Sequence, residues 1–334
     1  MRSGPGRIRR ALLFLTALIV LGLAVGAIYQ AISVRREAGR YPAPGKFADV
    51  GGRKIHYLCL GEQRRDVPTV IVEPSGFGNS LSAAQFRTSL SSYTRVCSYD
   101  RVGTGWSDPG PAVTSPAFLV SDLEHLLDSA AIAPPYVFVT SSIGGFTTEL
   151  FLRRHPERVA GAVFLDAADS DVLRRINSLV SRTNVAMLCT MQAAARFGIL
   201  RVMDPFKLRR AQPAESVARS IAQLYTTERM SALCGMARGV LTAAEDLDAA
   251  LPLSAGIPLS VLTAESTEGL VPDGIPGLRA KLDVFRDDWV TGQQEFAKRS
   301  AHGSWRLVRG SGHLISSDKP DEVIAAVLEF LSVR

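Results

Sequence analysis

The amino-acid sequence predicts an α/β protein: a mostly parallel sheet flanked by helices, with an inserted helical segment and an N-terminal transmembrane helix. Three observations predict this class. Short apolar runs alternate with helical patterns, one long stretch is helical throughout, and an unbroken apolar run lies near the N-terminus. Strands that alternate with helices pair in parallel and are buried on both faces, so they form continuous apolar runs. With 334 residues, 46% of them hydrophobic, the chain suits one large globular domain with additions.

The N-terminal apolar run covers residues 11–29, where only Thr16 and Tyr29 have polar side-chain atoms. A helix that crosses a bilayer core requires roughly 20 residues, which this run provides. It is either an uncleaved anchor or a signal peptide cut at the small residues 25–27, and its length favours the anchor. On either interpretation, the four arginines before the run place the N-terminus in the cytoplasm and the following domain outside it.

The formal net charge of +6 belongs to this N-terminal region. Residues 1–40 contain seven arginines and one glutamate, which accounts for the whole excess. The remainder of the chain is neutral, so the charge gives no reason to expect a nucleic-acid partner. The sequence has no histidine-rich cluster and no dinucleotide-binding glycine motif, and no metal or organic cofactor is therefore expected.

The remaining patterns divide the chain into segments. Residues 1–32 are the basic stub and the anchor, 33–46 a linker, 47–168 and 254–334 the α/β core, and 169–253 a helical cap. The cap shows helical patterns without a strand, and it is too long for a simple connection. It also contains every methionine except Met1. Methionine adapts its shape, so these residues suit either varied apolar ligands or the core of a small helical unit.

Residues 139–146, VTSSIGGF, follow a buried strand and open a helix, as a nucleophile elbow requires. In such a turn, the residues two before and two after the nucleophile pack against backbone and must be small. Counting back from Gly144 selects Ser142, with Thr140 on its other side. Choosing Ser141 instead would place two bulky aliphatic residues at these positions, so Ser142 is the predicted nucleophile.

Two further stretches add groups that a serine nucleophile needs. His313, in GSGHLISSDKP, follows the last predicted strand and so lies at the same edge of the sheet as Ser142. The loop EPSGFGNS follows an upstream buried strand, and the backbone around Phe77 can supply one N–H group for an oxyanion. Ile143, directly after the nucleophile, can supply the other.

Residues 99–108, YDRVGTGWSD, are similar to the YDR-x-G-x-G-x-S loop of the α/β-hydrolase superfamily, and PERVAGAVFLDA and GSGHLISSDKPDEV fit the same pattern. Over about residues 47–331 the chain resembles a capped enzyme of that superfamily, although the cap matches poorly. The resemblance implies a Ser–acid–His triad, an oxyanion hole and hydrolysis of an ester or related acyl bond. Two positions depart from it: Thr140 and Ser75 stand where the superfamily usually has glycine and histidine. The methionines of the cap favour a small-molecule ester substrate that is apolar.

The resemblance leaves two candidates for the acid. The acid usually follows the second-to-last strand, where this sequence has Glu265 but no aspartate. Some relatives place it one strand earlier, where Asp166 ends the run VFLDA. Asp166 is slightly favoured over Glu265, with capping of the next segment as its other interpretation. Both keep the order serine, acid, histidine along the chain.

The four cysteines form either two disulfides or four buried thiols. In the superfamily, the strands that match those containing Cys59 and Cys97 are neighbours. Cys189 and Cys234 both fall in the cap. The resemblance therefore implies the bonds Cys59–Cys97 and Cys189–Cys234, each stabilising by about 2–4 kcal/mol.

Together these features predict a membrane-anchored, extracytoplasmic serine hydrolase of the esterase or lipase-like kind. A serine at the elbow argues against dehalogenase and epoxide-hydrolase chemistry, which use aspartate there. An acyltransferase is the alternative that shares the acyl-enzyme. A non-catalytic binding protein on a hydrolase scaffold is the alternative from another class.

Overall fold

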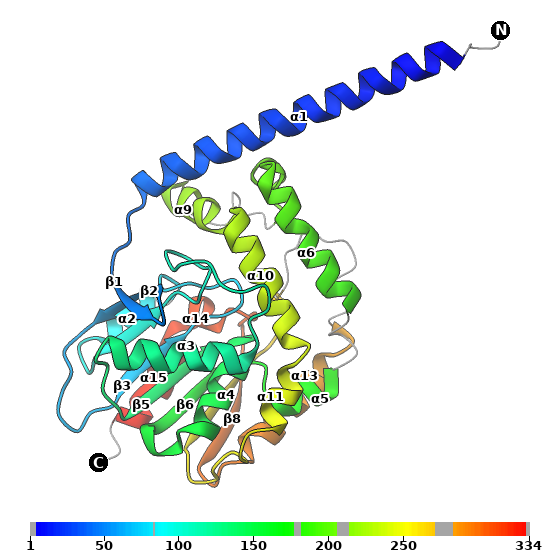
Figure 1. The fold of residues 1–334 in the computed structure, drawn as a ribbon. Helices are drawn as coiled ribbons and strands as arrows, with labels where there is room; N and C mark the ends of the chain where they lie inside the picture. Colours follow the sequence, from blue (N-terminus) through cyan, green and yellow to red (C-terminus); the bar gives the residue numbers. More distant parts are fainter. Residues whose placement is uncertain (1–4, 83, 177–181, 206–213, 271–282, 332–334) are drawn as a thin grey trace.

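The computed structural model describes residues 5–82, 84–176, 182–205, 214–270 and 283–331. A long N-terminal helix extends away from a sheet that is covered by helices on both faces (Figure 1). The sheet has eight strands in the order β1-β2-β4-β3-β5-β6-β7-β8. Strand β2 is antiparallel to both of its neighbours, β1 and β4, and all other neighbouring strands are parallel. The strands are β1 (Lys46–Val50), β2 (Arg53–Leu60), β3 (Thr69–Glu73), β4 (Val96–Tyr99), β5 (Tyr136–Ser141), β6 (Val159–Leu165), β7 (Leu259–Ala264) and β8 (Gly303–Val308). The predicted α/β class and the mostly parallel sheet are confirmed.

The two faces of the sheet have separate cores because side chains alternate along each strand. On β5, Tyr136 and Phe138 pack on one face, while Val137 and Val139 pack on the other. The first face is covered by α3 (Pro116–Ser129), α4 (Gly144–Arg154) and α13 (Arg286–Ala297). The second face is covered by α2 (Ala84–Leu90) and α15 (Pro320–Leu331), and α14 (Ile315–Asp318) lies just before α15.

Only helices are found between β6 and β7 among the residues that the structure describes there. They are α5 (Ser170–Ile176), α6 (Arg182–Arg196), α7 (Ile199–Met203), α9 (Ala214–Leu224), α10 (Thr227–Val240) and α11 (Ala243–Asp248). This helical insertion has a small core of its own, which includes Tyr225, Met230 and Met236. Met191 packs against this core, so several of the methionines fill space inside the insertion.

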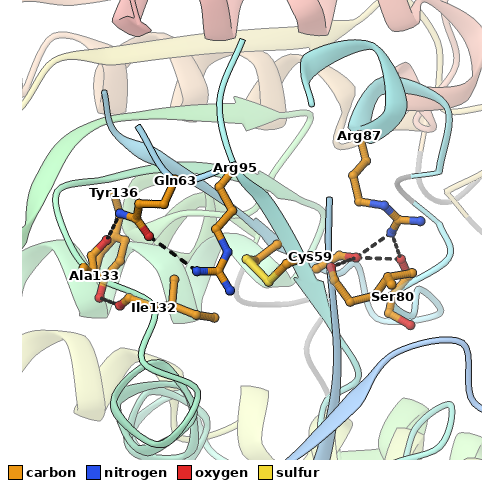
Figure 2. Close-up of a disulfide and its surroundings, with 11 residues drawn as sticks. Cys59, Gln63, Ser80, Arg87, Arg95, Ile132, Ala133 and Tyr136 are labelled. Atoms are coloured by element: carbon orange, nitrogen blue, oxygen red, sulfur yellow. Dashed lines mark hydrogen bonds between the residues drawn. A yellow bond between two sulfur atoms is a disulfide. The ribbon is translucent and has the colours of Figure 1, made fainter. Parts of the chain in front are cut away.

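Both expected disulfides are present. Cys59 on β2 lies opposite Cys97 on β4, with a Cα–Cα distance of 4.0 Å. Near this bond Arg87 donates to the carbonyl of Ser80 and Arg95 donates to Gln63 (Figure 2). The second bond joins Cys189 of α6 to Cys234 of α10, with a Cα–Cα distance of 4.8 Å.

Helix α1 (Pro5–Arg40) has the length and composition of a membrane span, with a mean hydropathy of 2.7 over its most apolar window. It continues to Arg40, so the first residues of the predicted linker are helical and the connection to β1 is short. The reason is a distant contact. Glu37 accepts two hydrogen bonds from Arg201 of α7, at 2.6 and 2.7 Å, and the next helix-breaking residue is Pro42.

The last turns of α1 pack on the helical insertion, as Figure 1 shows for α6 and α9. Arg201 is buried and also donates to Gln30 at 2.7 Å, and Gln30 donates to the carbonyl of Tyr225 at 2.9 Å. A Cβ on Gly26 would lie 2.3 Å from the carbonyl oxygen of Phe197, so glycine permits this close approach. Helix α1 is thus fixed to the insertion by contacts, besides being joined to β1 by the chain.

Candidate active site

Ser142 lies in a sharp turn between β5 and α4. Its φ angle of 54° is in the left-handed region, which is unfavourable for a residue with a side chain and is tolerated mainly at functional positions. Its carbonyl oxygen accepts from the N–H groups of Gly145 at 3.1 Å and Ala168 at 2.9 Å. These bonds hold the turn, which has the backbone conformation expected of a nucleophile elbow.

Gly144 and Gly145 are required by packing and not by a positive φ. A Cβ on Gly145 would lie 2.0 Å from the carbonyl oxygen of Ala168. A Cβ on Gly144 would lie 2.7 Å from the carbonyl oxygen of Pro74 and 3.0 Å from Oγ1 of Thr140. Thr140 therefore fits at the position of the usual glycine because the residue that faces it has no side chain.

His313 and Asp166 meet at the carboxyl edge of the sheet. Asp166 follows β6 directly and has a φ of 43°, and His313 lies between β8 and α14. Asp166 Oδ2 is 2.7 Å from Nδ1 of His313, and both residues are buried. An ionised carboxylate only accepts hydrogen bonds, so this contact places the proton on Nδ1 and leaves Nε2 as the acceptor.

The other carboxylate oxygen of Asp166 is held by two donors. Its Oδ1 accepts from Nε1 of Trp289 at 2.9 Å and from the N–H of Ala264 at 3.2 Å. Arg286 lies 4.0 Å from the same oxygen. The Trp289 ring also stands edge-on to His313, with centroids 6.4 Å apart. Trp289 therefore orients the carboxylate and borders the imidazole.

Glu265, the alternative acid, bonds elsewhere. It is exposed, and its Oε2 accepts from the N–H of Gly310 at 2.8 Å. Of the two candidates, Asp166 is the one that contacts His313.

The loop with Phe77 touches the start of α4. A Cβ on Gly76 would lie 2.9 Å from Cδ1 of Ile143, so the loop and the first turn of the helix are in contact. Ile143 is the N-cap residue of α4, where the N–H groups and the helix dipole favour negative charge. Phe77 is 44% exposed, and its loop borders the cavity described below.

A buried ion pair supports this loop. Arg101 donates to the carboxylate of Glu73 at the end of β3, at 2.8 Å from Nε, and to the carbonyl oxygens of Pro74 and, at 3.0 Å, Ser75. Tyr99 also donates to Glu73. Burial raises the pKa of the Glu73 carboxyl, while the Arg101 charge and the hydrogen bonds from Tyr99 and Arg101 lower it. Tyr99 and Arg101 of the YDR sequence thus stabilise the loop with Phe77 through these hydrogen bonds.

A second buried histidine–aspartate pair has a different environment. His56 Nδ1 is 2.8 Å from Oδ2 of Asp100, but its Nε2 accepts from the N–H of Gly45 at 3.1 Å. Both ring nitrogens are therefore used within the protein, so His56 is structural.

A cavity of 760 Å³ lies between the sheet edge and the helical insertion. His313, Ser141 and Phe77 line it from the core, and Arg229 and Gln223 line it from α10 and α9. The last two, like Trp289, were missed in the sequence because no motif marks them. Within the described ranges, no group of His, Cys, Asp and Glu residues is arranged to hold a metal ion.

The parallel sheet, the strained serine turn and the histidine–aspartate pair at one edge define a hydrolase-type α/β protein. The chain belongs to the alpha/beta hydrolase family, whose sequence profile matches residues 70–326. The Cif epoxide hydrolase from Acinetobacter nosocomialis is similar in fold, with a TM-score of 0.66 at 16% identity over 91% of this chain and 96% of that one. A thermophilic esterase from Thermogutta terrifontis gives a TM-score of 0.59 at 19% identity over 86% of this chain and 97% of that one.

Among curated proteins, an uncharacterized protein of Schizosaccharomyces pombe is 29% identical over 45% of this chain. An uncharacterized vacuolar membrane protein of Saccharomyces cerevisiae is 24% identical over 36% of it. The matches span only 33% and 21% of these relatives' own lengths.

Proposed function

We propose that this chain is a membrane-anchored serine hydrolase that cleaves a carboxylic ester or a related acyl bond. The observation that carries the proposal is the Asp166–His313 contact of 2.7 Å at the sheet edge where Ser142 occupies the elbow. Ser142 attacks the acyl carbon, and Nε2 of His313 takes its proton. Asp166 keeps His313 in the required tautomer, and the bond to the leaving group breaks as His313 returns the proton to it.

The N–H groups of Phe77 and Ile143 hold the oxyanion that forms during attack. The contact between the Gly76 backbone and Ile143 supports this role, since it brings the two donor segments together. Water then releases the acyl group from Ser142 by the same proton transfers in reverse. Solved structures of similar fold include proteins named as an esterase and an enol-lactonase, and others named as epoxide hydrolases, so the proposal rests on the residues of this chain and not on these neighbours.

A fluorophosphonate probe tests the nucleophile. The probe reacts with an activated serine, so the full-length protein should label once, and Ser142→Ala should abolish labelling as read by intact mass. Ser141→Ala is the matched control and should retain most of the labelling, because its side chain precedes the elbow. A wild-type protein that folds but never labels would refute the hydrolase and favour a binding protein on this scaffold.

Helix α1 is proposed as an uncleaved anchor with the catalytic domain on the extracytoplasmic side. Its packing on the insertion through Gly26, Gln30 and Glu37 supports retention, because cleavage after residue 27 would remove the Gly26 contact. The two disulfides support an oxidising compartment.

Mass spectrometry of the protein from a membrane fraction tests both points. We expect the peptide that spans residues 25–30 to be recovered intact. All four cysteines should resist alkylation until a reductant is added. A mature N-terminus near residue 28 would overturn the anchor, and thiols that alkylate without reduction would overturn the extracytoplasmic placement.

A further inference from the structure

Arg229 is a buried cation in the wall of the cavity that His313 also lines. It comes from the first turn of α10, is 3% exposed, and lies against the loop with Phe77. Its Nη2 donates to the carbonyl oxygen of Gly78 at 2.9 Å and to that of Gly76 at 3.3 Å. Its Nη1 has no acceptor, and no carboxylate lies within ion-pair distance among the described residues.

Arg229 therefore has no direct ion pair, and the nearest negative charge that acts on it is the more distant carboxylate of Asp100. Burial, followed by the positive charge of Arg101, lowers the pKa of Arg229 to about 10, so the group is still a cation at neutral pH. A buried charge without a partner is costly, and such groups in clefts are candidates for ligand contacts. Two carbonyl oxygens satisfy some of its donors but supply no negative charge.

Gln223 of α9 adds a second unpaired donor to the same cavity. Its Oε1 accepts from Nδ2 of Asn79 at 2.7 Å, which assigns its Nε2 as a donor, and this Nε2 is buried without an acceptor. Arg219, also on α9, contributes another cation to the lining. Glu73 is the acidic side chain in the described lining, and it is already bound by Arg101 and Tyr99.

We propose that Arg229 and Gln223 form a subsite for an anionic group of the substrate, either a carboxylate or a phosphate. This subsite is separate from the oxyanion hole at Phe77 and Ile143. Guanidinium and amide N–H groups match the oxygens of either anion. The inference deepens the proposed function and rests on it: the substrate is an ester with an anionic group besides the acyl bond that is cleaved. A purely apolar ester would leave both donors unpaired.

Direct binding to the full-length protein tests the subsite without relying on turnover. Hexanoate, hexyl phosphate and hexanol share a chain length and differ in the head group. By isothermal titration calorimetry, at least one of the two anions should bind at least about tenfold more tightly than hexanol, the range of one charged hydrogen-bonded contact. The ratio between hexanoate and hexyl phosphate then assigns the anion.

Arg229→Met should remove this preference, and Arg238→Met, an exposed arginine on the same helix, should keep it. Should Arg229→Met fail to fold, Arg229→Lys, which retains the charge, should keep part of the preference, and Gln223→Leu should reduce it. Equal binding of all three ligands to the wild-type protein, or an unchanged preference without Arg229 or Gln223, would overturn the subsite. Fluorophosphonate labelling reports on Ser142 separately, so failure of the subsite and failure of the hydrolase are distinguishable.

Discussion

Asp166→Asn should lower kcat for ester hydrolysis by roughly 10⁴-fold while leaving the fold intact. The substitution keeps the size of the side chain, and the amide oxygen can still accept from Trp289 Nε1 and the Ala264 N–H. The amide NH₂ then faces Nδ1 of His313, 2.7 Å away in the native contact. A donor there requires an unprotonated Nδ1, so the proton moves to Nε2. His313 can then no longer take the proton from Ser142.

Hydrolysis of a 4-nitrophenyl ester by the purified full-length protein measures this effect. Glu265→Gln is the matched control, because Glu265 directly follows the neighbouring strand β7 but bonds to the Gly310 N–H. We expect the control to retain kcat within a few-fold and Asp166→Asn to keep the thermal midpoint of the wild type. The opposite pattern, with activity lost in Glu265→Gln and kept in Asp166→Asn, would reassign the acid.

The sequence alone did not decide between Asp166 and Glu265 as the carboxylate that contacts His313. Asp166 and Glu265 each directly follow one of two adjacent parallel strands, so the chain pattern brings both to the carboxyl edge of the sheet. What separates them is the path of the His313 loop, 147 residues from Asp166, and the indole of Trp289 on α13. Neither contact has a local signal, because each depends on how distant segments pack.

The turn at Ser142 could be predicted from the sequence because the requirements of such a turn are local. The buried strand before it, the helix after it and the small residues around it lie within a few positions. The structure supplies the reason for the spacing: Gly144 and Gly145 face the carbonyl oxygens of Pro74 and Ala168 too closely for a Cβ. The parallel strands could also be predicted from the sequence, since burial on both faces makes them continuous apolar runs.

The contacts that the helical insertion makes with the rest of the chain could not be predicted from the sequence. The end of α1 is set by Arg201, 164 residues from Glu37. Arg229 reaches the Gly76 carbonyl from 153 residues away. Arginines of this kind resemble surface residues in a sequence, and only the structure shows that these two are buried against the cavity loop and against helix α1.

Arg101→Met should destabilise the protein by about 3–5 kcal/mol, the range for breaking a buried ion pair by removing one partner. The substitution leaves Glu73 buried with Tyr99 as its remaining donor and frees the carbonyl oxygens of Pro74 and Ser75. Urea denaturation, followed by circular dichroism, measures the loss. Arg64→Met, which removes an exposed arginine, is the control and should change stability by less than about 1 kcal/mol.

The pH dependence of this loss identifies its cause. Burial raises the pKa of Glu73 above its ordinary 4.5, and Arg101 opposes that rise. A carboxyl with a raised pKa binds its proton more tightly in the native state than in the unfolded chain. Its contribution to stability therefore falls as the pH rises through the window between the two pKa values. Without Arg101 the native pKa of Glu73 rises further, so the pH window over which stability falls extends to higher pH. The loss of stability in Arg101→Met should therefore be larger at pH 7.5 than at pH 5.

Adding Glu73→Gln to Arg101→Met separates the buried charge from lost packing. The double variant has no carboxylate to leave unpaired, so it should recover part of the stability and lose the extra pH dependence. Because Arg101 also holds the loop that precedes Phe77, the double variant should still hydrolyse esters more slowly than the wild type. Full recovery of kcat would show that the ion pair stabilises the fold without positioning the loop that contains Phe77. A deficit equal at both pH values would show that Glu73 is not the group left uncompensated.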